Sequence, residues 1–407
     1  MVMGGALELP SDQDASGRSL GDAELELLRQ VIESGTLTAT KGKMTASLEA
    51  AFAHRHDMSS AVACASGTTA IHAAVAAIDP NPGDEVITTS ITDMGALTPL
   101  LYQGAIPTFA DVHPVTGNIT AASVADRISD RTVAVMVTHL FGNPAEIDEI
   151  VAVAARHDLP VIEDCAQAYS ARSAGRPVGT IGDVGCFSLQ QGKHITCGEG
   201  GLVIGNDEAL VAEARLWVNK GWGYGQPDPD HRTMALNGRI SELQSAVALA
   251  QLEGLDRTVA TRISNANSLS AKLSGVPGLR CPSASAGDVH SYWRYPLLVD
   301  STQIPGGPVA LATELRNADV ASAPRYIQKP AFRCGVFVDR KGLGSSGFPF
   351  TEARPEALDH AEDDFAGTFR YLEDVLVLPW NEQFTAAHVE RLAEAVAASV
   401  DLLRARA

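Results

Sequence analysis

The sequence predicts an α/β fold with a large domain followed by a smaller one. From residue 48 onward, helix-like and strand-like blocks alternate, which is the order that builds an open sheet covered by helices. Several strand-like blocks are almost continuously apolar, as expected for parallel strands buried on both faces. The chain has 407 residues, more than one compact core usually holds, so we expect domains at 1–255 and 256–407.

The blocks of the large domain follow one another in a regular order. A helix at 47–56 and a helix at 67–78 flank the first strand, and a further helix is expected at 145–157; the expected strands are 60–66, 85–90, 106–112, 132–140 and 160–166. Two short strands, at 182–189 and 200–205, are expected to pair with each other.

The smaller domain follows a long helical stretch at 241–273, which we expect to connect the two domains. The segment after it, 275–287, is rich in proline and glycine and is typical of a domain boundary. Beyond it we expect a strand and two helices, at 292–300, 308–318 and 386–403. This order predicts a compact α/β unit.

Composition excludes several classes of protein. The formal net charge of −18 argues against sequence-independent binding to nucleic acid or to an anionic membrane, because both need a basic face. The six cysteines have no metal-like spacing, and we interpret them as reduced thiols. No signal-peptide pattern and no long apolar run is present. We therefore expect a cytoplasmic protein that acts on a small molecule and holds no metal.

Lys193 is the first candidate catalytic residue. It lies in the polar, glycine-flanked segment QQGKHITCGEGG between two strand-like blocks. A lysine that forms a Schiff base with an aldehyde must be partly deprotonated, and desolvation together with neighbouring positive charge brings this about. Most lysines are solvated surface charges, so position alone leaves both interpretations open.

Asp164 and Gln167 lie at the end of the strand-like block VIEDCA and just beyond it. Strands of open α/β sheets deliver ligand-binding residues at this end. A carboxylate here would keep a pyridinium nitrogen protonated, as pyridoxal chemistry requires, and Gln167 would reach the hydroxyl of the same ring. Asp164 is also suited to cap a helix.

The segment Ser66-Gly67-Thr68-Thr69 lies between a strand and an apolar helix. Backbone N–H groups at such a helix start, together with the helix dipole, bind phosphate. Ser188, five residues before Lys193, offers a hydroxyl for the same phosphate. Simple capping of the helix by Ser66 or a threonine explains the motif equally well.

Five segments, taken together, resemble in order and spacing the sugar aminotransferase family of the DegT/StrS type: SGTTA, GDEVITT, VIEDCAQA, FSLQQGKHITCGEGG and NGRISELQSAVALAQL. The resemblance extends from about residue 25 to the carboxyl terminus and is strongest through residue 255. It implies fold type I of the pyridoxal-phosphate-dependent enzymes, in which a large domain with a mostly parallel seven-stranded sheet precedes a smaller α/β domain.

The resemblance also implies roles for individual residues. Lys193 would carry pyridoxal 5'-phosphate as a Schiff base, Asp164 would pair with the pyridine nitrogen, and Gln167 would lie near the ring hydroxyl. The phosphate would be held by Gly67, Thr68 and Ser188.

Two more residues matter through the partner subunit. By the same resemblance, Asn237 of the segment LNGRISE would reach the phosphate bound by the other subunit, so the active site would require a homodimer. Arg239 in this segment is a candidate for binding a substrate carboxylate or oxygen, because a guanidinium binds such groups bidentately.

One segment departs from the family pattern. Many relatives place an aromatic residue over the cofactor ring in the stretch after GDEVITT, where this chain has SITDMGAL. Met94 would cover the ring through its polarizable sulfur. Asp93 at that position would instead make the ring face more polar.

The resemblance implies an aminotransferase that moves an amino group from glutamate or glutamine to a ketone in two half-reactions. No clear basic cluster for a diphosphate is evident in the second domain, so we expect a keto-cyclitol or small keto-sugar of antibiotic or other secondary metabolism. A nucleotide-linked keto-sugar is the alternative. We expect segments 325–332, 345–350 and 378–384 to line the substrate cleft.

Two further readings remain open. Sugar dehydratases of the same family replace the lysine with histidine, so Lys193 argues against that activity, although His194 lies beside it. The second of these hypotheses is a non-catalytic regulatory protein that binds the cofactor.

Overall fold

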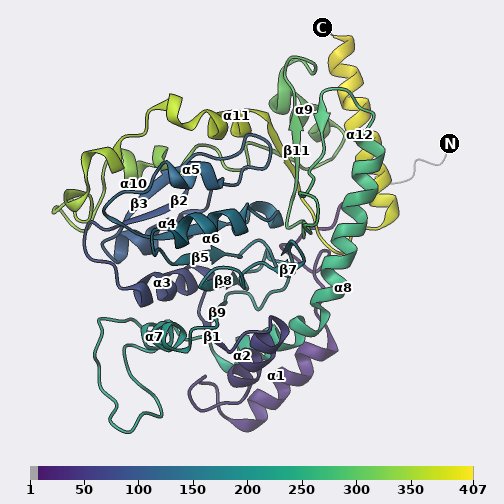
Figure 1. The fold of residues 1–407 in the computed structure, drawn as a ribbon. Coiled ribbons are helices and arrows are strands. Elements are labelled where there is room, and N and C mark those ends of the chain that lie inside the picture. Colours follow the sequence, from purple (N-terminus) through teal and green to yellow (C-terminus); the bar gives the residue numbers. More distant parts are fainter. Residues whose placement is uncertain (1–7, 407) are drawn as a thin grey trace.

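The computed structural model describes residues 8–406, in which a large sheet and a smaller sheet are flanked by helices (Figure 1). The large sheet has seven strands in the order β1-β9-β8-β5-β4-β2-β3. Their bounds are β1 Ser60–Cys64, β2 Glu85–Thr89, β3 Ile106–Ala110, β4 Thr132–Thr138, β5 Val161–Asp164, β8 Val184–Ser188 and β9 Gly201–Gly205.

Strand β9 is antiparallel to both of its neighbours, β1 and β8, whereas the other neighbouring pairs are parallel. The predicted mostly parallel, seven-stranded sheet is therefore confirmed, and so is the expected pairing of 182–189 with 200–205. Strands β6 (Arg172–Ser173) and β7 (Arg176–Pro177) form a separate hairpin.

Helices cover both faces of the large sheet, which explains why nearly all residues of its strands are buried. In β4, Ala134 and Met136 pack with α3 and α7, while Val135 and Val137 pack with α6 on the other face. This alternation follows from the two-residue period of a strand. The helices of this domain are α1 Asp22–Ser34, α2 Met44–Arg55, α3 Gly67–Ile78, α4 Met94–Tyr102, α5 Ala121–Ala125, α6 Ile147–Ala155 and α7 Glu208–Val218.

The smaller sheet is antiparallel, with the order β10-β11-β13-β12. Helix α8 (Glu242–Leu273) runs along one side of the molecule from α1 and α2 to this sheet and lies beside α12 (Figure 1). The other elements are β10 Leu279–Arg280, β11 Tyr295–Val299, α9 Gly307–Asn317, β12 Ala323–Pro324, α10 Gly335–Val338, α11 Ala366–Asp374, β13 Val375–Leu378 and α12 Ala386–Ala405.

Residues 331–365 return to the large sheet, where Phe332 and Phe365 pack in one cluster with Phe109 of β3 and Leu97 of α4. Short 3₁₀ helices lie at Leu140–Gly142, Ala331–Arg333, Phe350–Glu352, Pro355–Leu358 and Glu362–Phe365. The predicted division after residue 255 falls inside α8 and stays a prediction. Within residues 8–406, no helix combines the length and apolar character that crossing a membrane requires.

Candidate active site

A pocket of about 570 Å³ lies where the parallel strands of the large sheet end. The segments after β1, β2 and β8 and the last residue of β5 all contribute to it, as expected at the carboxyl edge of such a sheet. Seven predicted site residues line this pocket together: Gly67, Thr68, Met94, Asp164, Gln167, Ser188 and Lys193.

The Lys193 amine lies over the indole ring of Trp293, with Nζ 4.2 Å from the ring centroid. Its main chain is held on both sides, since its N–H donates to Gln190 O at 2.9 Å and its carbonyl accepts from Arg18 Nη1 at 2.7 Å. Burial lowers the pKa of the amine to about 8, against the opposing charge of Asp164. A large fraction of Lys193 is therefore neutral slightly above neutral pH.

Asp164 is the last residue of β5 and is 5% exposed. One carboxylate oxygen accepts from Ala166 N at 3.1 Å and the other from Thr138 Oγ1 at 3.4 Å. No helix begins in residues 165–183, so the alternative role of Asp164 as a helix cap is wrong. Burial raises the pKa of this carboxyl, and the positive charge of Lys193 opposes the rise. A cationic ligand beside this buried carboxyl would stabilise its charged form.

Gln167 has a fixed orientation beside Asp164. Its Oε1 accepts a hydrogen bond from Phe141 N at 2.8 Å. Because the oxygen is used there, the amide NH₂ is the end left to donate to a group in the pocket. Phe141 has a positive φ of 56°, and this left-handed conformation belongs to the turn that places its N–H near Gln167.

Helix α3 begins at the wall of the same pocket. Ser66 caps this helix by accepting a hydrogen bond from Thr69 N at 3.1 Å. The capping interpretation is therefore confirmed. It leaves the N–H groups of Gly67 and Thr68 in the first turn without helical partners, which is where an anion binds. A Cβ on Gly67 would lie 2.7 Å from Ser188 Cβ, so the cradle has no room for a larger residue.

Asp93 and Met94 both line the pocket, at the start of α4. Asp93 is the N-cap of this helix, and its Oδ1 accepts from Gly95 N at 2.7 Å. Met94 is half-buried and packs against the cluster that contains Leu97 and Phe109. The structure thus brings both candidates to the pocket.

Asn237 and Arg239 are not brought to the pocket of their own chain. Asn237 is exposed, and its Oδ1 accepts from Arg239 N at 3.3 Å. The loop between α7 and α8 projects from the body of the molecule (Figure 1) and carries Met234, 94% exposed, and Leu236, 74% exposed. Among residues 8–406, no hydrogen-bond partner satisfies the buried Arg239 Nη1.

Several contributors were not predicted from the sequence. Trp293 lies just before β11 rather than inside a strand, and its Nε1 donates to Gly192 O at 2.6 Å. Arg294 stacks on the same indole, 4.5 Å from the ring centroid, and pairs with Asp12 at 2.6 Å. No local pattern in the sequence indicates the contacts of Trp293 with Gly192 or of Arg294 with Asp12, because they join segments more than a hundred residues apart.

The three expected cleft segments behave differently. Segment 325–332 contributes Tyr326 and Ile327 to the pocket. Segments 345–350 and 378–384 do not line the pocket of their own chain, so for both that expectation stays a prediction. In segment 378–384, Trp380 is fully buried and Asn381 Nδ2 donates to Pro10 O at 2.8 Å, so this segment packs in the core and anchors the amino-terminal segment.

His194 turns away from the pocket although it follows Lys193 directly. Its ring is buried, with Nε2 3.1 Å from Ser291 O, and burial holds its pKa well below the usual value. His194 is therefore not placed to take the role of the lysine, which the dehydratase hypothesis would require.

His139, Glu163 and Cys165 form a buried cluster of potential metal ligands, of which Glu163 and Cys165 flank Asp164 in the sequence. Glu163 accepts from His139 Nε2 at 3.0 Å and from backbone N–H groups of residues 179, 181 and 182. His139 Nδ1 accepts from Ala145 N at 3.1 Å. Although burial alone would raise it, these bonds hold the pKa of Glu163 below its usual value. Protein groups thus satisfy His139 and Glu163.

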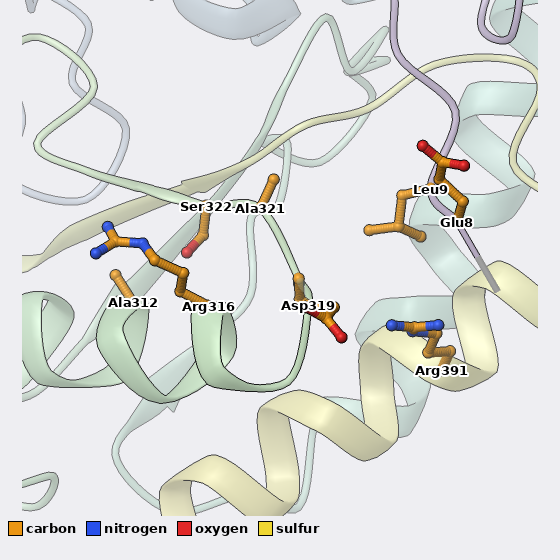
Figure 2. Close-up of a pocket in the computed structure, with 9 residues that line it drawn as sticks. Glu8, Leu9, Ala312, Arg316, Asp319, Ala321, Ser322 and Arg391 are labelled. Carbon is orange, nitrogen blue, oxygen red and sulfur yellow. The ribbon is translucent and has the colours of Figure 1, made fainter. Parts of the chain in front are cut away.

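Another pocket, of about 680 Å³, lies between α9, α12 and the amino-terminal segment (Figure 2). Arg316 of α9, Asp319 just beyond this helix and Arg391 of α12 line it, but none of the predicted site residues does. Arg391 Nη2 donates to Ala318 O at 3.3 Å. The chemistry predicted from the sequence therefore belongs to the first pocket.

The sequence profile of the DegT/DnrJ/EryC1/StrS aminotransferase family matches residues 18–358. This chain belongs to that family. The predicted family membership, fold class and aminotransferase activity are thereby confirmed. The substrates of the enzyme are a small amino donor and a keto acceptor.

Known members of this aminotransferase family show the similarity in detail. A GDP-perosamine synthase of Caulobacter vibrioides is 39% identical over 231 residues, 56% of this chain and 61% of that protein. An L-glutamine:2-deoxy-scyllo-inosose aminotransferase of Micromonospora echinospora is 36% identical over 349 residues, 80% of this chain and 83% of that protein. The crystal structure of the aminotransferase TlmJ from Streptoalloteichus hindustanus has a TM-score of 0.82 at 28% identity, covering 95% of this chain and 98% of that one.

Proposed function

We propose that this aminotransferase uses pyridoxal 5'-phosphate to move an amino group from glutamate or glutamine to a keto-cyclitol or keto-sugar of antibiotic or other secondary metabolism. One arrangement carries the proposal: the Lys193 amine and the buried Asp164 carboxylate line one pocket together with the start of helix α3. The lysine, the acid and the anion cradle match the aldehyde, the ring nitrogen and the phosphate of that cofactor.

The residues present fit this cofactor. When bound, it supplies an aldehyde carbon and an electron-withdrawing ring. Lys193 would hold the aldehyde carbon, Asp164 would keep the proton on the ring nitrogen, and the Gln167 NH₂ would donate to the ring hydroxyl. Ser188 and the N–H groups of the first turn of α3 would hold the phosphate.

Lys193 is also suited to move the proton that transamination transfers. Burial lowers the pKa of its amine to about 8, so both the neutral and the charged form are populated near that pH. Its main chain is held by Gln190 and Arg18, and its amine rests on Trp293, which limits where the proton is delivered.

The charges that line the pocket favour an acceptor without a diphosphate. Among residues 8–406, Lys193 is the sole lysine or arginine on its wall, whereas Asp93, Asp164 and Glu199 are acidic. A nucleotide diphosphate would bring more negative charge beside these acids without a guanidinium of the same chain to meet it. This carries the preference for a free keto ring.

A nucleotide-linked keto-sugar has one observation in its favour besides the similarity to a GDP-perosamine synthase. The segment that brings Tyr326 to the pocket also carries Arg325 and Lys329, which line a separate pocket of about 570 Å³. Arg333 lies there too, but its guanidinium pairs with Glu362 at 2.5 Å. A diphosphate reaching that pocket would meet two cations.

The proposed active site also takes residues from a second copy of the chain. Asn237 and Arg239 lie outside their own pocket, next to the exposed apolar side chains of Met234 and Leu236. Exposed apolar groups on a projecting loop favour a protein contact. We infer a homodimer in which Asn237 reaches the partner's phosphate and Arg239 the partner's substrate.

The direct test offers the enzyme a panel of donors and ketones and follows the products by mass spectrometry. We expect amination of a free keto-cyclitol or keto-sugar with glutamine or glutamate. Amination of nucleotide-linked keto-sugars alone would support the alternative acceptor. No amination of any ketone, in protein that has taken up the cofactor, would contradict the proposed substrate class.

A further inference from the structure

Asp93 has a carboxylate oxygen that its structural role as a helix cap does not use. It follows β2, is exposed, and lines the pocket that contains Lys193. Only Oδ1 is used, to accept from Gly95 N at 2.7 Å. Within residues 8–406, Asp93 Oδ2 has neither a hydrogen-bond donor nor an ion-pair partner. An uncharged asparagine or serine would cap α4 as well as an aspartate does.

The cations that surround the pocket are committed elsewhere. Arg294 pairs with Asp12 at 2.6 Å, and the two side chains are 10% and 12% exposed. Arg18 donates from Nη1 to the carbonyl of Lys193 at 2.7 Å and from Nε to the carbonyl of Asp12 at 2.9 Å. Lys193 is reserved for the cofactor in the proposed function. Asp93 does act electrostatically on Lys193, but among residues 8–406 of the same chain no other lysine or arginine lines the pocket. Asp93 Oδ2 is therefore open to an ammonium group of a ligand.

Aromatic side chains on the same pocket suit a cationic ligand. Trp293 and Tyr326 both line it, with their ring centroids 6.1 Å apart and their planes at 86°. The Trp293 ring already accommodates the Lys193 ammonium at 4.2 Å. Aromatic faces attract ammonium groups, and they pack against the apolar faces of ring-shaped ligands.

We propose that Asp93 binds an ammonium group of the keto acceptor, so that the preferred acceptor is a keto ring that already carries an amine. This inference rests on the proposed function and narrows its substrate class. The ammonium would lie at Asp93 Oδ2 while the ketone carbon faces Lys193. The product would then be a diamine, formed by adding a second amino group to the ring.

The test compares two stable products. Streptamine, a 1,3-diaminocyclitol, and scyllo-inosamine, the monoamine, are titrated into the cofactor-loaded protein, and their dissociation constants are measured by calorimetry. We expect the diamine to bind about tenfold more tightly, because one additional charge-assisted contact is worth roughly this factor. In Asp93→Asn the ratio should fall to about one, since the cap is kept and the charge is lost.

A matched variant separates charge from capping. Asp207 caps α7 in the same way, accepting from Ala209 N at 2.8 Å and Leu210 N at 3.1 Å, and it does not line the pocket. Asp207→Asn should keep the tenfold ratio. Asp93→Ser, a second neutral cap, replaces Asp93→Asn if the latter fails to fold. Three results would overturn the inference. The wild type would bind the diamine and the monoamine equally tightly, or the tenfold ratio of dissociation constants would persist after loss of the Asp93 charge. The third is loss of that ratio in Glu199→Gln rather than in Asp93→Asn.

Failure of the proposed function would look different. The change in visible absorbance on adding glutamine or glutamate reports the donor half-reaction, in which the acceptor takes no part. A normal donor half-reaction with no preference for the diamine removes only the role of Asp93. Absence of the donor half-reaction removes the proposed function itself.

Discussion

The Lys193 amine rests on the indole of Trp293, 4.2 Å from the ring centroid, and the indole N–H in turn donates to the carbonyl of Gly192 at 2.6 Å. One aromatic side chain thus holds both the lysine amine and the backbone that precedes it. Trp293 belongs to the segment that enters the smaller sheet, so both sheets determine where the lysine lies.

Lys193→Ala is expected to abolish transamination, to below about 1% of the wild-type rate, because it removes the covalent anchor and the proton carrier together. The circular dichroism spectrum should be unchanged. Lys341→Ala, at an exposed lysine that does not line the pocket, is the control and should keep its rate. Turnover above a few per cent in Lys193→Ala would remove the assignment.

The rate at which cofactor-free protein takes up pyridoxal 5'-phosphate should depend on pH. The neutral amine is the reactive form, and burial lowers the pKa of Lys193 to about 8. The uptake rate, followed by visible absorbance, should therefore rise as pH increases through about 8 and then level off. A rise that continues to the ordinary lysine pKa near 10.4 would show that the amine is not desolvated.

Asp164→Asn is expected to lower the transamination rate by about a hundredfold or more while cofactor is still bound, because an amide does not hold the ring nitrogen protonated. Steady-state kinetics and the visible spectrum measure the two properties separately. A nearly normal rate would reduce Asp164 to a structural residue.

The neighbouring carboxylate provides the contrast. Glu163→Gln should lower the free energy of unfolding by about 3 kcal/mol, because the new amide NH₂ would face backbone donors that now meet carboxylate oxygens. Those donors are the N–H groups of Gly179, Ile181 and Gly182, at 2.6–2.7 Å. Chemical denaturation measures this loss. Unchanged stability would show that the cluster around Glu163 is dispensable.

Gly67→Ala should weaken cofactor binding by about tenfold, because its Cβ would lie 2.7 Å from Ser188 Cβ and push the phosphate cradle open. Equilibrium titration with cofactor measures the effect. Gly275→Ala, where a Cβ meets nothing within 4 Å, is the matched control and should bind normally. Equal affinities in both variants would place the phosphate elsewhere.

Mixed dimers test the shared active site. If Asn237 serves the partner's pocket, a hybrid of a Lys193→Ala chain and an Asn237→Ala chain contains one site without either lesion. Random assortment gives about half hybrids, so activity should return to roughly a quarter of the wild-type value per site, provided that each variant alone is inactive. No recovery, with exchange confirmed by native mass spectrometry, would place Asn237 in its own subunit's site.

The local sequence was sufficient to predict the large sheet and the site residues at the ends of its strands. Apolar runs of strand length indicated buried parallel strands, and the carboxyl edge of such a sheet is the place where Asp164, Ser188 and the start of α3 must meet. The physical reason is that strand period and helix capping are set by neighbours in the chain, and that alternating helices and strands favour parallel strands with a common carboxyl edge.

Tertiary structure alone decided the rest of the pocket. Adjacent residues Glu163 and Asp164 are both acidic, but only Asp164 lines the pocket, because the Glu163 carboxylate accepts hydrogen bonds from backbone N–H groups. Trp293 and Arg18 reach Lys193 from segments about a hundred residues or more away along the chain. Such contacts leave no periodic signal in the sequence, because they depend on how two sheets and the amino-terminal segment pack, and packing is a property of the folded chain as a whole.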